Sequence, residues 1–178
     1  MLRYTLTLAL LLPVFDGLAT QAAAQHACDD PEADQWVKDV HGWTSSYDAL
    51  AMYAVEVYGQ PVQCVGQVTS EFDGVDYGLI HLDFAGGAVF EMETQPPETS
   101  IATLTDSSGF RDEVAVRDLL EKYAADIGVK IDWTTASVEE VEKERTVRFW
   151  DPEEGLNASA TFVYREQRLV TARFSMAL

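Results

Sequence analysis

Alternating apolar residues on both sides of a glycine pair constrain the fold of this chain more than any other feature. In residues 77–94 (YGLIHLDFAGGAVFEMET), apolar residues alternate with other residues on both sides of Gly86-Gly87: Ile80, Leu82 and Phe84 before it, and Ala88, Phe90 and Met92 after it. A period of two is typical of a β-strand with one buried face. We therefore expect a β-hairpin whose apolar face lies against the protein core.

The register of this hairpin can also be predicted. A two-residue turn would place Leu82 opposite Glu91 and would bury carboxylates. A three-residue loop, Ala85-Gly86-Gly87, places Leu82 opposite Phe90 instead. Because a slip of one residue turns every side chain to the other face, only the three-residue loop buries a coherent apolar surface. The resulting pairs are Phe84 with Ala88, Leu82 with Phe90, and Ile80 with Met92.

The same argument applies to a second hairpin near the C-terminus. A three-residue loop, Glu166-Gln167-Arg168, would pair Ala160, Phe162 and Tyr164 with Phe174, Ala172 and Val170. A two-residue turn would place Phe162 opposite the polar Thr171. We expect the three-residue loop here too.

Two stretches have apolar residues at helical spacing. One follows Ser45-Ser46-Tyr47-Asp48 and ends at Gly59, and the other lies between Asp112 and Gly128. A shorter helix is expected from Asp30-Pro31 to about Gly42. We predict an α+β fold in which an antiparallel β-sheet packs against two main helices. Residues 99–105 are expected to form an edge strand, and residues 134–143 a loop with a possible extension of the preceding strand.

Recurrence of a helix followed by strands suggests a tandem duplication of an αββββ unit, although chance recurrence of a common pattern explains it equally well. The N-terminus has Arg3, a short apolar run and Ala22-Ala23-Ala24, which predicts a signal peptide cleaved after Ala24. The expected organisation is a signal at 1–24 and one α+β domain at 25–178, with two similar halves at about 43–106 and 107–178. The protein would then be exported, to the periplasm or the extracellular space.

The strong acidity limits the classes of partner. The chain has 12 Lys and Arg against 30 Asp and Glu, a net charge of −18. Loss of residues 1–24 removes one base (Arg3) and one acid (Asp16), so the net charge stays at −18. Such a surface repels phosphate backbones and anionic lipids, which argues against nucleic-acid and membrane partners. Attraction of a cationic partner could explain the charge, but solubility is the explanation that we favour.

Two cysteines, Cys28 and Cys64, remain after this cleavage. An even number of cysteines in an exported chain predicts a disulfide bond. No C-x-x-C motif is present to favour redox chemistry. We therefore expect a structural bridge that ties the N-terminal arm to the strand containing Cys64.

No familiar catalytic or cofactor-binding signature occurs in the chain. The predicted register places His81 on the outer face of the hairpin, opposite Glu91 and beside Asp83. These three residues are weak candidates for a metal site or for general acid/base chemistry. The plainer interpretation is a surface charge pair, so we assign no catalytic residue and no cofactor.

The sequence supports two hypotheses about function. The first is an exported, non-enzymatic module that binds an envelope protein or a small ligand. The second is a metal-dependent or general acid/base hydrolase that uses His81, Asp83 and Glu91. A variant of the first hypothesis is an inhibitor or export chaperone that presents residues 95–100 to its partner.

Overall fold

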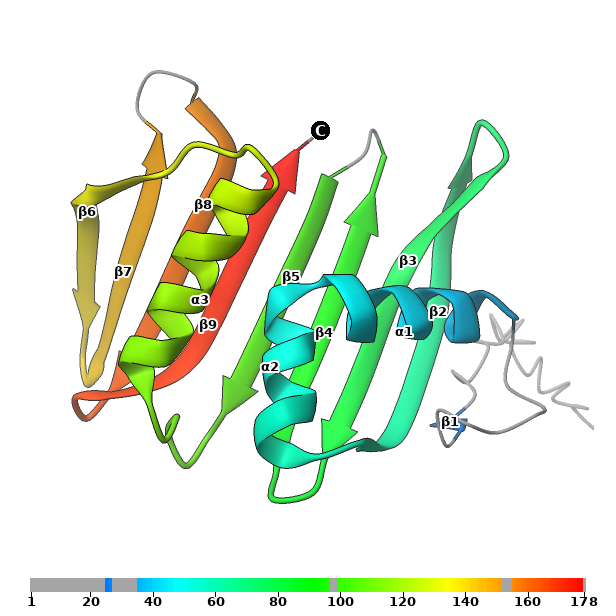
Figure 1. The fold of residues 1–178 in the computed structure, drawn as a ribbon, viewed down its shortest axis with the longest axis horizontal. Coiled ribbons are helices and arrows are strands. Elements are labelled where there is room, and N and C mark those ends of the chain that lie inside the picture. Colours follow the sequence, from blue (N-terminus) through cyan, green and yellow to red (C-terminus); the bar gives the residue numbers. More distant parts are fainter. Residues whose placement is uncertain (1–24, 27–34, 97–98, 152–154, 178) are drawn as a thin grey trace, which may run out of the picture.

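One antiparallel sheet contains every strand of the computed structural model, which describes residues 25–26, 35–96, 99–151 and 155–177. The strand order is β1-β2-β3-β4-β5-β9-β8-β7-β6, so the strands of both sequence halves meet where β5 pairs with β9 (Figure 1). The strands are β1 (Gln25–His26), β2 (Pro61–Phe72), β3 (Val75–Phe84), β4 (Ala88–Gln95), β5 (Thr99–Asp106), β6 (Asp132–Val141), β7 (Glu144–Asp151), β8 (Gly155–Arg165) and β9 (Arg168–Ala177).

Three helices lie on the same face of the sheet: α1 (Gln35–Tyr47), α2 (Ala49–Tyr58) and α3 (Glu113–Asp126). The core lies between them and the sheet. It buries the four phenylalanines of the two predicted hairpins, each at most 4% exposed: Phe84, Phe90, Phe162 and Phe174. None of the helices in the described part of the chain has the length and apolarity needed to cross a membrane.

The prediction of a sheet packed against two main helices is wrong. The fold is dominated by the sheet, and its helical layer has three short helices of 13, 10 and 14 residues. The helix expected to end near Gly42 continues to Tyr47, and the hydroxyls of Thr44 and Ser45 donate to the His41 carbonyl within it. These residues therefore belong to the last turns of α1 and do not start α2.

The suggested pair of αββββ units is an incomplete description of the fold. Residues before α2 add α1 to the helical layer, where α1 contacts both α2 and the sheet, and add β1 to the edge of the sheet. One helix followed by four strands describes α2 with β2–β5 and α3 with β6–β9, but it leaves out α1 and β1. The predicted domain boundaries remain untested.

The predicted register of the first hairpin is confirmed. Leu82 pairs with Phe90 and Ile80 with Met92, and residues 85–87 connect β3 to β4. All four of these paired residues are buried.

In the second hairpin two of the three predicted pairs are correct, but the predicted loop is wrong and Tyr164 pairs with Leu169 in place of Val170. Phe162 pairs with Ala172 as predicted, and Ala160 with Phe174. The turn has two residues, Glu166 and Gln167, both with positive φ, and a register shift follows between Val163 and Tyr164. Beyond this shift, the strands pair as a three-residue loop would have paired them. The shift also lets the consecutive residues Leu169 and Val170 both be buried.

Two further predictions about strands are wrong. Residues 99–105 do not form an edge strand, because β5 lies between β4 and β9. Residues 134–143 are not mainly a loop, and the strand extension that we also considered is what the structure has: most of them belong to β6, which pairs with β7 and forms the far edge of the sheet. β6 cannot be recognised from alternating apolar residues because its side chains from Thr134 to Val141 are all exposed.

Candidate functional site

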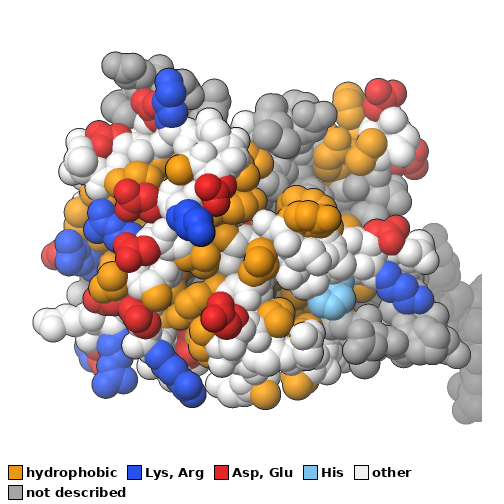
Figure 2. Space-filling model, viewed as in Figure 1, with side chains coloured by type: hydrophobic (Ala, Val, Ile, Leu, Met, Phe, Trp, Pro, Cys, Tyr) orange, Lys and Arg blue, Asp and Glu red, His pale blue; other side chains and the backbone are white. Residues whose placement is uncertain are grey.

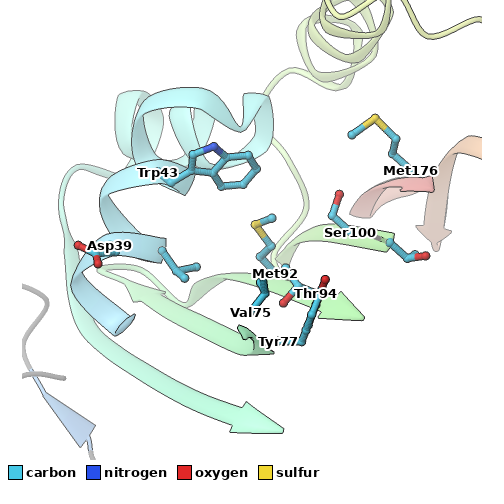
Figure 3. A pocket seen from close by; sticks show the side chains of 10 residues that line it. Asp39, Trp43, Val75, Tyr77, Met92, Thr94, Ser100 and Met176 are labelled. Carbon is cyan, nitrogen blue, oxygen red and sulfur yellow. The ribbon is translucent and has the colours of Figure 1, made fainter. Parts of the chain in front are cut away.

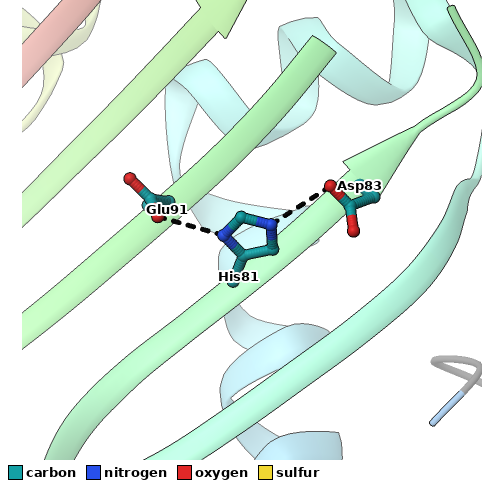
Figure 4. Close-up of polar contacts among 3 residues, drawn as sticks. All are labelled: His81, Asp83 and Glu91. Atoms are coloured by element: carbon teal, nitrogen blue, oxygen red, sulfur yellow. Dashed lines mark hydrogen bonds and ion pairs between the residues drawn. The ribbon is translucent and has the colours of Figure 1, made fainter. Parts of the chain in front are cut away.

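His81, Asp83 and Glu91 lie together on the face of the sheet opposite the helices, as the register predicted (Figure 4). Their neighbours Ile80 and Leu82 point into the core, so period-two alternation turns His81 outward. The His81 Nδ1 atom lies 3.0 Å from Glu91 Oε1, and Nε2 lies 3.1 Å from Asp83 Oδ1. Each ring nitrogen thus faces one carboxylate.

This arrangement favours a protonated imidazole. Partial burial lowers the pKa of His81, but the hydrogen bonds and charges of Glu91 and Asp83 raise it, and the net shift is upward. A protonated ring donates from both nitrogens and leaves no lone pair for a metal. Among the described residues, no group of three or more His, Cys, Asp or Glu side chains is placed to hold a metal ion.

His81 and Glu91 belong to a row of paired residues on the outer face of the sheet, and Asp83 lies beside it. Further along the row, the Arg173 Nε donates to Thr103 Oγ1 at 3.2 Å, and the Arg148 Nε donates to Thr161 Oγ1 at 3.4 Å. The strand pairings place six polar residues side by side in the order His81, Glu91, Thr103, Arg173, Thr161 and Arg148. Such cross-strand pairs stabilise an exposed sheet face.

The predicted disulfide is only partly within the described residues. Cys64 is fully buried on β2, and its strand partner is His26 of β1. Cys28 lies outside the described residues, as does the predicted signal at 1–24. The bridge and the signal therefore stay predictions, although residue 28 is two positions from the strand partner of Cys64.

An apolar groove that sequence reasoning missed lies on the helical side of the sheet, between α1 and the strands (Figure 3). Its volume is about 490 Å³, within the range of small-ligand sites. The indole of Trp43 projects from α1 over the sheet, and Met92 and Met176 line the opposite side. The lining residues are Asp39, Val40, Trp43, Val75, Tyr77, Met92, Thr94, Thr99, Ser100 and Met176.

Local structure explains why this apolar surface is left uncovered. The side chain of Asp48 caps the start of α2, directly after the end of α1, by accepting hydrogen bonds from the backbone N–H groups of Leu50 and Ala51. Because α2 starts directly after α1, α1 crosses the strands and leaves their far ends without a helix above them (Figure 1). Trp43 is 43% exposed and Val75 is 52% exposed as a result.

Thr94 holds the floor of the groove to the neighbouring strand. Its hydroxyl accepts a hydrogen bond from the Gly78 N–H at 2.9 Å and donates to the Gly78 carbonyl at 3.3 Å. These two bonds connect β4 to β3 next to Tyr77. The polar atoms of Thr94 are thus paired within the protein, so the groove offers mainly apolar contact.

A second cavity of about 820 Å³ lies between the start of α3 and the β6–β7 turn. It is lined by charged residues of both signs, and these pair across it. Lys143 Nζ lies 3.5 Å from Glu166 Oε1, and Arg145 Nε lies 3.9 Å from Glu140 Oε1. Exposed ion pairs of this kind are common on protein surfaces, so we assign no site here.

Basic residues are distributed very unevenly between the two halves of the sheet. Residues 39–110 contain eleven Asp and Glu but no Lys or Arg, whereas residues 111–178 contain fourteen Asp and Glu and ten Lys and Arg. On the helical side, most of the Lys and Arg side chains lie over the half that contains α3, and one lies at the opposite end of this face (Figure 2). This contrast was visible in the sequence, but only the structure connects it with the groove.

No family model, curated protein or solved structure matches this chain.

Proposed function

We propose that the protein is an exported, non-enzymatic binding module and that the groove beside α1 is its binding site. The observation that carries this proposal is the open apolar groove, in which Trp43 and Val75 stay about half exposed. An exposed tryptophan beside apolar side chains is a typical anchor point for a partner. Thr99 and Ser100, which belong to the segment 95–100 expected to contact a partner, line this site.

The hydrolase alternative has less support. Catalytic acid/base pairs usually lie in concave sites that hold the substrate. None of His81, Asp83 and Glu91 lines either of the two cavities, and Glu91 is 48% exposed on an outer sheet face. A protonated histidine between two carboxylates is also satisfied as it stands, which suits a structural pair better than a general base.

Nile red, a neutral apolar dye that brightens in apolar surroundings, tests the proposed site. We expect the purified protein to bind one dye molecule, and the double variant Trp43→Ala/Val75→Ser to bind at least fivefold more weakly. The smaller variants remove the apolar walls of the groove and leave its backbone unchanged.

Two matched controls replace exposed apolar residues elsewhere. Tyr47 is 66% exposed on the same helix, and Val138 is 51% exposed on β6, and neither lines the groove. Tyr47→Ala and Val138→Ser should bind the dye like the wild-type protein. Equal loss of binding in the controls, or undiminished binding by the double variant, would contradict the assignment of the groove.

A further inference from the structure

We propose that the groove binds an apolar side chain from a protein segment in which Lys or Arg residues flank that side chain. This inference rests on the proposed binding function and adds the chemistry of the partner.

The shape of the groove suits one inserted side chain. It is open to solvent along the face between α1 and the strand ends, and its lining is contributed by α1, β3, β4, β5 and the end of β9. Trp43 and Val75 stand half exposed at the opening, where an inserted aromatic or aliphatic group would cover them.

The charged residues beside the groove are mainly acidic, although Lys38 directly precedes the lining residue Asp39 on α1. Every lining residue except Met176 belongs to residues 39–110, the stretch that has no Lys or Arg. Asp39 lies at one end of the groove, where it is exposed. The β2–β3 hairpin that places Val75 at the opening also carries Glu71 and Asp73, both exposed.

This pattern selects a basic partner over other occupants. Lys and Arg beside the inserted side chain would be attracted to these carboxylates, and the long-range field would speed their approach. The same field repels anionic lipids. A second copy of this chain would bring another strongly acidic surface, so it is a poorer occupant.

A set of nine-residue peptides tests the inference. Each has Leu, Phe or Trp at its centre, and its flanks carry either Lys and Arg, Ser and Gln, or Asp and Glu. At 50 mM salt we expect the basic set to bind at least tenfold more tightly than the neutral set, and the acidic set not to bind. Raising the salt to 500 mM should remove most of the difference, because exposed charges are then screened.

Variants locate this binding. Trp43→Ala should weaken binding of a basic Phe-centred peptide at least fivefold, whereas Tyr47→Ala should not change it. Asp39→Lys should reduce the preference for basic over neutral peptides at least threefold. Glu139→Lys, which makes the same change in net charge on exposed β6, should leave the preference unchanged.

The possible failures are distinguishable. Basic and neutral peptides that bind equally well, with both lost in Trp43→Ala, would overturn the partner chemistry and keep the binding function. Basic peptides that bind without their central apolar residue would show charge attraction alone and overturn the inference. A dimer that Trp43→Ala dissociates would make a second copy the occupant and also overturn it. Failure of both peptides and Nile red would overturn the binding function itself.

Discussion

Asp48 combines a capping role with an unfavourable burial. It is 4% exposed, and its Oδ1 accepts hydrogen bonds from the backbone of Leu50 at 2.9 Å and Ala51 at 3.2 Å. Burial raises the pKa of Asp48 from 3.8 to about 6, although these hydrogen bonds oppose the shift. A carboxyl whose pKa is higher in the folded than in the unfolded state makes the protein less stable as the pH rises from the unfolded pKa, 3.8, to the folded pKa, about 6.

We therefore predict that Asp48→Asn stabilises the protein at pH 7. The amide oxygen can still cap α2, but no charge is buried. A pKa difference of about two units corresponds to about 3 kcal/mol, which is an upper bound for the gain. Urea denaturation at pH 4 and pH 7 checks this, and the gain should be present at pH 7 and nearly absent at pH 4. Asp48→Ala loses the cap and should be less stable than Asp48→Asn at both pH values.

The His81 pair predicts the opposite dependence on pH. Since the pKa of His81 is raised in the folded protein, the pair adds stability below the ordinary histidine pKa of about 6.5, and this stability is lost as the pH rises through the raised pKa. His81→Gln should lower the free energy of unfolding by roughly 0.5–1 kcal/mol at pH 5.5, a value typical of exposed pairs. The loss should be smaller at pH 9. Equal losses at both pH values would mean that the charge of His81 contributes nothing.

At the scale of elements, the β2–β3 pairing depends on Gly78. A Cβ atom at this position would lie 2.0 Å from the Gln67 carbonyl oxygen. The strands approach closely here because their register shifts between Val68 and Ser70. Tyr77, which lines the groove, directly precedes Gly78.

Gly78→Ala should therefore destabilise the protein by about 3 kcal/mol, since rigid backbone would have to move. Gly42→Ala is the matched control. Gly42 lies inside α1 with nothing within 4 Å of its added Cβ, so alanine there should stabilise the protein by about 0.5–1 kcal/mol. Thermal unfolding of both variants checks the prediction, which fails if the two substitutions act in the same direction.

The two hairpins show how far sequence patterns determine the elements. In the first hairpin, turn length alone decides which face is buried, so the pairing of Leu82 with Phe90 could be predicted. In the second hairpin, a register shift between Val163 and Tyr164 lets a two-residue turn produce the strand pairs that we expected from a three-residue loop. Nothing in the sequence at Leu169-Val170 distinguishes such a bulge from a longer loop. The end of α1 could not be predicted because Thr and Ser residues such as Thr44 and Ser45 can cap the start of a helix, or can donate their hydroxyls to a backbone carbonyl inside a helix, as they do here.

For the whole molecule, the candidate site could be predicted only in part. The His81 triad followed from local alternation because all three residues belong to one hairpin. The groove could not be predicted, because Trp43, Val75 and Met176 come from distant parts of the chain and have no common spacing. The lack of Lys and Arg in residues 39–110 can be seen in the sequence. Its relation to a binding site depends on which surface of the folded protein those residues form.

The methionines provide the most direct test of binding in the groove. Met92 and Met176 line it, whereas Met52 is 49% exposed on α2 and serves as an internal control. The methionine methyl groups are labelled with ¹³C, and indole, a neutral molecule about as large as an aromatic side chain, is titrated into the protein. We predict saturable NMR shifts of the Met92 and Met176 methyl signals with no change at Met52. Unchanged Met92 and Met176 signals at saturating indole, or equal shifts of all three, would contradict the groove as the binding site.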